Sequence, residues 1–371
     1  AYSVKVLQDY RGGRVNPYFG AYGALQVHGG GHSATNNNGV YGLVFGSSTI
    51  TWRRHLAPSA IDTLSGGVSA GNTDNYNVTS ITDSTWGELA DGRPLAPHPW
   101  GVLLLIPPSL GGAACGSLLQ VVNPAAGAIG LNFKAAHRFD FNSTTDGNVT
   151  VARASATGGA LGVSYGAPVL CGLDHDNLRA FIFPNATAMN MQWLALASGA
   201  YQVSATKAPF DVDGSDSAGV GYDASATIIE IPERGLLVMA QRRGGVLRLD
   251  WADVSVADPE VGGTATLSAT VTLPDAEWSA ACWCSDNGRI IVGGLADGDV
   301  AEITVPATLT NTWTVTVVSP PSGGLDTGEA GLGYSNTRGL FDYNPRTKCI
   351  TLPFVGTSGD DQVRVYRPTG T

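Results

Sequence analysis

Charged residues are scarce in this chain, and that scarcity is the first constraint on what the protein can be. Asp, Glu, Lys and Arg make up 14% of the 371 residues, whereas 43% of the residues are hydrophobic. Soluble domains usually have about 25% charged residues, and disordered chains combine high charge with few apolar residues. The composition therefore excludes a largely disordered chain and supplies ample material for a core.

Basic residues are fewer still, and they form no cluster. The 21 Lys and Arg are outnumbered by 31 Asp and Glu, which gives a formal net charge of −10. Nucleic-acid binding needs a patch of Lys and Arg against the phosphates, so we expect no nucleic-acid partner. No apolar run approaches the ~20 residues of a membrane span. The first ten residues lack the layout of a signal peptide, so either a leader was removed or export does not use one.

Cysteine and helical periodicity are also nearly absent. There are five Cys, an odd number at low density that does not fit a disulfide scaffold. Cys282 and Cys284 share one face of an expected strand, and we interpret them as buried thiols; a metal pair is the alternative, although no His follows at ligand spacing. No 12-residue stretch shows an apolar i, i+3, i+4 stripe, and the 49 Gly favour short strands joined by tight turns.

What the sequence does contain is a repeat of about 56 residues. Each unit opens with an aromatic residue and continues with an apolar strand, a polar turn, a second apolar strand and two further strands. The openings lie at Tyr10, Trp100, Tyr165, Tyr222, Trp278 and Tyr334. The spacing is close to 56 residues from Tyr165 on, whereas Trp100 opens a looser copy and the first unit is longer. Four short antiparallel strands at a near-constant period are typical of propeller blades. The sequence therefore predicts an all-β, six-bladed β-propeller.

The predicted propeller occupies residues 1–371 as a single domain. Its last unit has only three strands, whereas residues 2–9 alternate like a strand. We expect this N-terminal strand to complete the last blade and close the ring, because closure removes two exposed strand edges. Residues 58–99 are a long insertion or a degenerate blade, so seven blades is the alternative count.

A glycine run in the first unit carries a family resemblance. Gly29, Gly30 and Gly31 end one expected strand, Tyr41 lies in the next strand and Trp52 in the one after. In this arrangement residues 27–58 resemble a kelch-type blade of the galactose-oxidase-like propellers. We interpret these residues as structural, because Gly permits positive φ at a tight strand end and the aromatic rings fill the space between blades.

A second segment carries a resemblance that bears on the biological source of the chain. It spans residues 91–107 and has the sequence DGRPLAPHPWGVLLLIP. It resembles the stretch that follows such a blade in uncharacterised propellers of bacteria and their phages. The resemblance implies a propeller in a bacteriophage or bacterial setting, and it implies no activity.

Candidate binding residues gather around the same unit. His28 and His32 flank the glycine run, and with His98 we expect them near the propeller axis, together with Arg93 and Arg338. One interpretation is that the three imidazoles together bind a metal ion. The other interpretation is that these imidazoles hydrogen-bond backbone carbonyls at blade edges.

An acidic loop is the remaining weak metal candidate. Asp211, Asp213 and Asp216 resemble part of a calcium loop, but the loop lacks the Glu at position 12 and the flanking helices of an EF-hand. We therefore predict no cofactor, with adventitious Ca²⁺ at this loop as the alternative to a solvated loop.

No catalytic motif occurs in the sequence: there is no G-x-S-x-G, H-E-x-x-H or Walker loop. The turn formed by Asp174, His175 and Asp176 has a catalytic composition, yet a polar β-turn accounts for it. We therefore predict no catalytic residue and a non-catalytic binding or structural propeller. Its polar loops suit contacts with proteins or carbohydrate.

The phage resemblance implies that this propeller is a virion component, such as a tail, fibre or capsid-surface protein. Its partners would be other virion or surface proteins and a host glycan, and its location would be the virion or the extracellular space. Two alternatives stay open. One is a secreted enzyme, a metal-dependent oxidase or a sugar lyase or hydrolase, with an axial site; the other is a bacterial surface or periplasmic scaffold.

Deletion of residues 1–9 tests the closure of the ring. We expect a large fall in melting temperature, or aggregation, because two strand edges would become exposed. An unchanged melting temperature in a thermal scan would show that these residues do not complete a blade.

Overall fold

The computed structural model describes the strands and turns of the chain and leaves gaps between them. The described residues are 13–28, 38–59, 81–83, 88–89, 91–94, 103–121, 136–154, 157–158, 169–184, 190–207, 226–256, 262–274, 280–295, 298–319, 341–355 and 361–371. No helix among them is long and apolar enough to cross a membrane.

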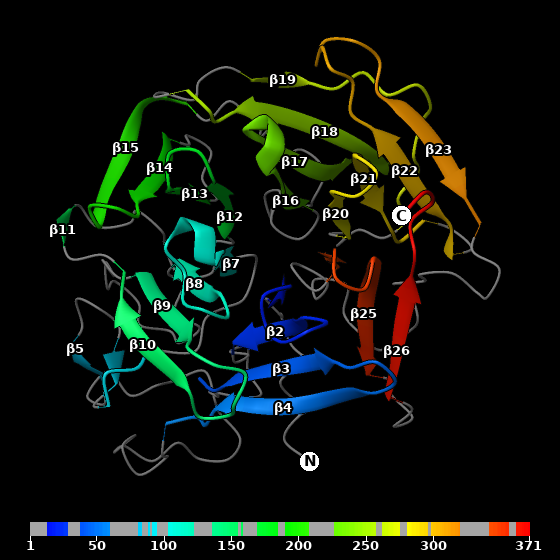
Figure 1. The fold of residues 1–371 in the computed structure, drawn as a ribbon. Coiled ribbons are helices and arrows are strands. Elements are labelled where there is room, and N and C mark those ends of the chain that lie inside the picture. The colour runs from blue at the N-terminus through cyan, green and yellow to red at the C-terminus, as the bar shows by residue number, and fades with distance from the viewer. Residues whose placement is uncertain are drawn as a thin grey trace, which may run out of the picture.

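Six antiparallel sheets stand around a central axis, each with its first strand innermost (Figure 1). Blade 1 contains β1 (Gly13–Asn16), β2 (Ala24–His28), β3 (Val40–Phe45) and β4 (Ile50–Leu56), and blade 2 contains β7 (Leu103–Ile106), β8 (Ser117–Val121), β9 (Ala136–Phe141) and β10 (Val149–Arg153). Blade 3 contains β12 (Val169–Asp174), β13 (Arg179–Pro184), β14 (Asn190–Ala195) and β15 (Ala200–Lys207), and blade 4 contains β16 (Ala226–Ile231), β17 (Leu236–Arg243), β18 (Val246–Asp253) and β19 (Gly262–Thr264). Blade 5 contains β20 (Ala281–Cys284), β21 (Arg289–Val292), β22 (Val300–Thr304) and β23 (Thr314–Val318), and blade 6 contains β24 (Tyr343–Asn344), β25 (Cys349–Val355) and β26 (Asp361–Tyr366).

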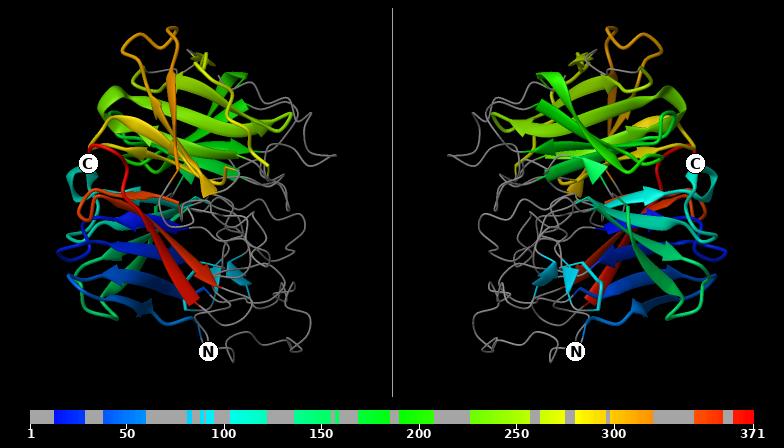
Figure 2. Two further views of the ribbon diagram at one scale, coloured as in Figure 1. Left: turned by 90° about the vertical axis from the view of Figure 1, so that its right-hand side faces the viewer. Right: turned by 90° about the vertical axis from the view of Figure 1, so that its left-hand side faces the viewer.

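The prediction of an all-β, six-bladed propeller is confirmed. Five blades have four antiparallel strands, and three strands are described for blade 6. The described residues contain no α-helix, and 3₁₀ turns lie at Pro108–Leu110 and Pro232–Arg234. Side views show the sheets arranged around the axis, with the C-terminus on the face that Figure 1 presents (Figure 2).

The predicted long insertion is described only in part. Within residues 58–99, β5 (Ile81–Asp83) and β6 (Glu88–Leu89) form a two-stranded hairpin separate from the blades. A short strand, β11 (Thr157–Gly158), adds to blade 3 parallel to β15. The expected closing strand, residues 2–9, lies outside the described residues and stays a prediction.

The core fills the spaces between neighbouring blades. One cluster runs through blades 4, 5, 6 and 1, a second joins blades 3 and 4, and a third joins blades 1 and 2. Blade 4 is therefore covered on both faces, and its second strand is apolar at successive positions rather than at alternate ones. In β17 the first six residues are all buried, and each Val, Leu or Met among them contributes roughly 1.5–3 kcal/mol.

In blades 3 to 6, side chains at the polar turn between the first two strands attach the blade to its neighbour. In blade 3 the Arg179 guanidinium donates to the carbonyls of Val254 and Val256, at 2.8 and 2.7 Å, in the loop after the third strand of blade 4. In the same turn, the Asn177 side chain donates to Ser255 O at 3.2 Å. Side chains at matching turn positions thus satisfy carbonyls that no sheet partner reaches.

Blades 4 and 5 repeat this attachment. Arg234 of blade 4 donates to Ala307 O at 3.1 Å in blade 5, and Asn287 of blade 5 donates to Thr369 O at 2.9 Å beyond β26. The loop after a third strand is the acceptor in blades 4 and 5. Thr369 holds the corresponding place in blade 6, and β26 is therefore the third strand of that blade.

A buried carboxylate reinforces the junction between blades 5 and 6. Glu302 accepts hydrogen bonds from Tyr366 Oη and from Thr369 N, each at 2.8 Å, and pairs with Arg289. Burial alone would raise the pKa of Glu302, but the donors from Thr369, Tyr366 and Arg289 outweigh it and lower the pKa. The C-terminal residues are thus held against blade 5 by an ionised group.

Blade 6 in turn contacts blade 1. The Asn344 side chain donates to Tyr22 O at 2.8 Å, and Arg346 Nε donates to Pro17 O at 3.2 Å. The first and last described blades are therefore neighbours around the axis.

Replacement of Arg179 by Met tests the attachment of blade 3 to blade 4. Asp174, whose side chain is fully buried and lies 2.8 Å from Arg179, would lose its countercharge. We expect a loss of about 3–5 kcal/mol in urea unfolding, because a single charge would stay buried without a partner. Lys348→Met is the control: Lys348 is half exposed in its ion pair with Asp286, and its removal should cost less than about 1 kcal/mol. Equal losses in the two variants would contradict the assigned role.

Candidate axial binding site

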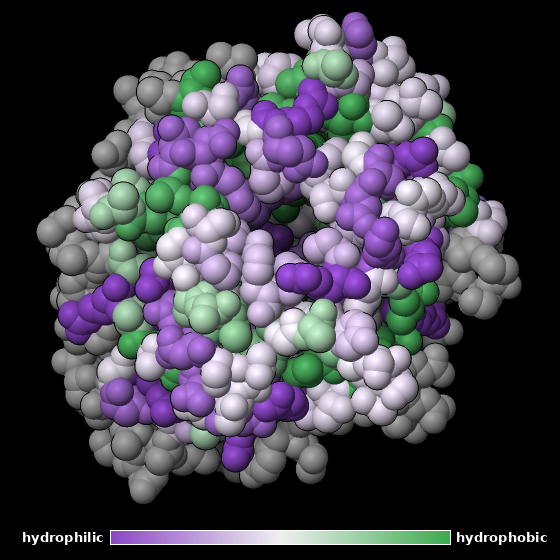
Figure 3. All heavy atoms as spheres, viewed as in Figure 1, coloured by the Kyte–Doolittle hydropathy of each residue, from purple (hydrophilic) through white to green (hydrophobic). Residues whose placement is uncertain are grey.

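A pocket of about 210 Å³ lies on the central axis, where the C-terminal ends of the innermost strands converge. The space-filling view shows this face hollowed at its centre (Figure 3). All six blades contribute to the lining, among others through Arg14, Leu105, His175, Glu230, Cys282 and Asp342. The pocket is therefore a property of the six blades together and not of any one of them.

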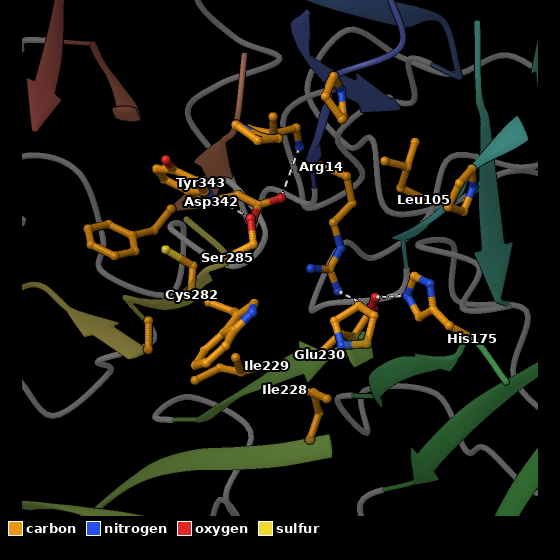
Figure 4. Close-up of a pocket in the computed structure, with 18 of the residues that line it drawn as sticks. Arg14, Leu105, His175, Ile228, Ile229, Glu230, Cys282, Ser285, Asp342 and Tyr343 are labelled. Carbon is orange, nitrogen blue, oxygen red and sulfur yellow. Dashed lines mark hydrogen bonds and ion pairs between the residues drawn. The ribbon is translucent and has the colours of Figure 1, made fainter. Parts of the chain in front are cut away.

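Arg14 lies at the centre of the pocket (Figure 4). Its Nε donates to Leu103 O in blade 2 at 2.9 Å, and a terminal nitrogen lies 3.5 Å from Glu230 Oε1 in blade 4. The side chain is only 16% exposed. A guanidinium carries five N–H donors, and only the Nε–H makes a hydrogen bond to a described residue. One terminal nitrogen faces Glu230, and the remaining N–H groups are open to a ligand.

Glu230 is fixed from two sides. Its Oε1 accepts a hydrogen bond from Leu173 N at 3.1 Å, and its Oε2 lies 3.3 Å from His175 Nε2. Burial alone would raise the pKa of Glu230, but Arg14, His175 and the Leu173 N–H outweigh burial and lower the pKa. The carboxylate is therefore ionised at neutral pH.

Asp342 behaves differently in the same pocket. Its two oxygens accept hydrogen bonds from Val15 N at 3.1 Å and from Tyr343 N at 2.9 Å. Burial nevertheless raises the pKa of Asp342 to about 6, and the attraction of Arg14 offsets only part of that effect. This carboxyl is mostly ionised at pH 7 and takes up a proton in mild acid.

The rim of the pocket is aromatic, and its thiol is inert. The Trp283 indole N–H donates to Glu233 Oε1 at 2.7 Å, which orients the ring at the edge of the pocket. Burial raises the pKa of the Cys282 thiol well above its usual range, so the thiol is protonated and a poor nucleophile. The pocket offers fixed charges, hydrogen-bond donors and an aromatic ring, which are features of a binding site.

Two of the predicted binding residues are described, and neither lines the pocket. His28 is fully buried between blades 1 and 2, with its Nε2 3.0 Å from Asn38 O and its ring 4.3 Å from that of Phe139. Burial lowers the pKa of His28 to about 3, so this imidazole is neutral. Arg93 bonds Ala57 O and forms an ion pair of 3.5 Å with Asp91.

The other predicted site residues lie outside the described residues, and their roles stay predictions. They are His32, His98, Arg338, the glycines Gly29, Gly30 and Gly31, and the weak metal candidates Asp211, Asp213 and Asp216. Of the expected structural aromatics, Tyr41 is buried in the large core cluster and Trp52 packs against it. Among described residues, no three His, Cys, Asp or Glu side chains group as metal ligands.

The residues at the centre of the pocket were not predicted. Arg14, Glu230 and Asp342 come from blades 1, 4 and 6 and are far apart in sequence. The available signal was a charged residue within an apolar innermost strand, as in ATIIEI of β16. The expected catalytic-looking turn has a structural role: Asp174 accepts hydrogen bonds from Asp176 N and Asn177 N and pairs with Arg179.

Comparisons with known proteins find similar solved structures and no family. No protein-family model matches the chain, and no curated protein matches it. A mutant of the Aleuria aurantia lectin AAL in complex with Fucα1-6GlcNAc is 15% identical, with a TM-score of 0.43 over 82% of this chain and 78% of the lectin. The Dos1 propeller is 11% identical, with a TM-score of 0.34 over 76% of this chain and 61% of its own. A chain of the mitotic checkpoint complex is 10% identical, with a TM-score of 0.41 over 98% and 89%.

The raised pKa of Asp342 predicts a specific pH dependence of stability. The folded-state pKa of about 6 lies above the ordinary value of about 3.9, so protonation favours the folded protein. That stabilisation is fully present below the ordinary pKa and is lost as the pH rises through 6. Between pH 7.5 and 5 the wild type should gain on the order of 1 kcal/mol relative to Asp342→Asn.

Melting temperatures across this pH range measure the effect. Asp253→Asn is the matched control, because Asp253 caps Ser255 outside the pocket and this variant removes one carboxyl group while it leaves Asp342 in place. A difference between wild type and Asp342→Asn that does not change with pH would contradict the assignment.

Proposed function

We propose that this chain is a non-catalytic binding propeller that holds a small polar ligand in its axial pocket. One observation carries the proposal: the Arg14 side chain is only 16% exposed, yet most of its N–H donors make no hydrogen bond to a described residue. Buried donors are normally satisfied, so a group fixed at both Leu103 and Glu230 and still open to the pocket is suited to bind a ligand.

The neighbours of Arg14 support binding over chemistry. The two Glu230 oxygens face Leu173 N and His175, which leaves this carboxylate a weak nucleophile. The Cys282 thiol is kept protonated by burial. These groups are held in place, and preorganised groups gain affinity because little freedom is lost on binding.

A second candidate function is hydrolysis of a glycosidic bond. One observation favours it: the pocket holds two carboxyl groups whose pKa values are shifted in opposite directions, with Glu230 lowered and Asp342 raised to about 6. A proton-donating and an ionised carboxyl are the pair that glycosidases use.

The proposal about the source of this binding propeller rests on a sequence resemblance. Residues 91–107 resemble a stretch of propellers from bacteria and their phages. We propose a component of the bacteriophage virion, kelch-like in its first blade, that contacts a host-surface glycan or protein. Detection of the chain by mass spectrometry in purified particles supports this role, and a chain found only as a free enzyme with turnover contradicts it.

Thermal shift with a panel of monosaccharides, amino acids and short peptides tests axial binding. We expect at least one compound to raise the melting temperature of the wild type, and Arg14→Met to weaken its binding at least tenfold, because hydrogen bonds to a charged group contribute about 1.5–3 kcal/mol.

Arg138→Met, which removes a blade 2 arginine outside the pocket, is the control and should bind as the wild type does. Equal binding by Arg14→Met would rule out the pocket. Release of reducing sugar from oligosaccharides in the same samples would favour hydrolysis instead.

A further inference from the structure

We propose that the axial pocket recognises a neutral, hydroxyl-rich sugar unit, whose adjacent hydroxyl groups bridge Arg14 and Asp342. This inference rests on the proposed function, because it names the ligand class for the same pocket. Its basis is that Arg14, which keeps open N–H donors, lies with Glu230 and Asp342 in one small cavity (Figure 4), which the oriented Trp283 ring also lines.

The signs of the charges exclude strongly charged ligands. Arg14 provides the positive charge at the centre, while Glu230 and Asp342 flank it and Glu233 lies at the rim. An anionic ligand that pairs with Arg14 meets these carboxylates, and a cationic ligand that pairs with a carboxylate meets the guanidinium. A neutral ligand meets neither repulsion, whose strength grows as water is displaced.

A hydroxyl group matches this mixed pocket because it both donates and accepts. One sugar hydroxyl can accept from a free Arg14 N–H, and its neighbour can donate to an Asp342 oxygen. Both Asp342 oxygens already accept one backbone N–H, from Val15 and Tyr343, and a carboxylate oxygen has a second lone pair for a further donor. The backbone contacts therefore orient Asp342 without occupying it fully.

The size and walls of the cavity suit one sugar ring. Its volume of about 210 Å³ is below the ~300–1,000 Å³ typical of sites for drug-sized ligands. Leu105, Ile228 and Ile229 form apolar wall, and Trp283 and Tyr18 add aromatic surface. The Trp283 ring, held through its indole N–H by Glu233, provides a flat apolar surface of the kind that packs against the C–H face of a sugar.

Isothermal titration of the full chain with three matched classes of sugar tests this inference. The probes are neutral methyl hexosides, the corresponding uronic acids and the corresponding amino sugars, together with deoxy analogues that each lack one hydroxyl group. We expect at least one neutral hexoside to bind, and its uronic acid and amino sugar counterparts to bind at least tenfold more weakly. Loss of either bridging hydroxyl should also weaken binding at least tenfold, since a site built to bond a hydroxyl rejects analogues that lack it.

Variants connect the affinity to the residues. Asp342→Asn and Arg14→Met should each weaken neutral-sugar binding at least tenfold, whereas Trp283→Phe should weaken it less than Trp283→Ala. Since Arg14→Met also removes a partner of buried Glu230, Asp342→Asn and the deoxy analogues keep the test independent of that variant's folding. The control Arg138→Met should retain wild-type affinity.

The outcomes separate the two proposals. Tighter binding of a uronic acid or amino sugar that still depends on Arg14 would overturn the neutral-sugar inference and leave axial binding intact. Binding of a peptide or amino acid in place of sugars would do the same. Absence of Arg14-dependent binding for every compound would overturn the proposed function and this inference together.

Discussion

Side-chain hydrogen bonds between blades are the interaction on which the rest of the structure depends. Within a blade the sheet ladder satisfies the backbone, whereas among the described residues no sheet extends from one blade to the next, and backbone contacts such as the isolated bridge between Leu267 and Trp313 are local. Apolar packing fills the space between them and leaves the loop carbonyls unpaired, which is costly where water is excluded. Arg179, Arg234 and Asn287 satisfy such carbonyls in the next blade. The same contacts hold the blades in a defined arrangement around the axis.

The axial pocket is built from contacts of the same kind. Arg14 of blade 1 bonds Leu103 of blade 2, Leu173 of blade 3 bonds Glu230 of blade 4, and Val15 of blade 1 bonds Asp342 of blade 6. The groups that face the cavity are therefore also groups that join blades. A ligand in this pocket would meet side chains that the contacts between blades already hold, so the entropic cost of ordering them would have been met in folding.

The few charged residues of the sequence include several that have a role inside the fold. In a chain with 14% charged residues, several ionised side chains lie between blades or at the axis rather than on the surface. Asp174, Glu302 and Glu230 are each largely buried and each has a cationic partner. Such groups are strongly coupled to their surroundings, because the interior screens charge far less than water does. The opposite pKa shifts of Glu230 and Asp342 follow from their different partners.

Sequence could predict the blades because the repeat preserves what every blade must do. Each unit needs apolar strands and a polar turn, and the N-x-R pattern at Asn177–Arg179 and Asn287–Arg289 is the trace of the inter-blade contact. The position nearest the axis has no common task and therefore no common residue: it is Arg14 in one blade, His175 in another and Glu230 in a third. Which of these residues meet depends on how far each innermost strand extends along the axis, a quantity that no local pattern contains.

His28 shows the converse. Its position beside the glycine run suggested an axial role, but its ring lies against Phe139 of blade 2. In this fold the repeated positions determine the ring, and a specific site arises where the repeat is not kept.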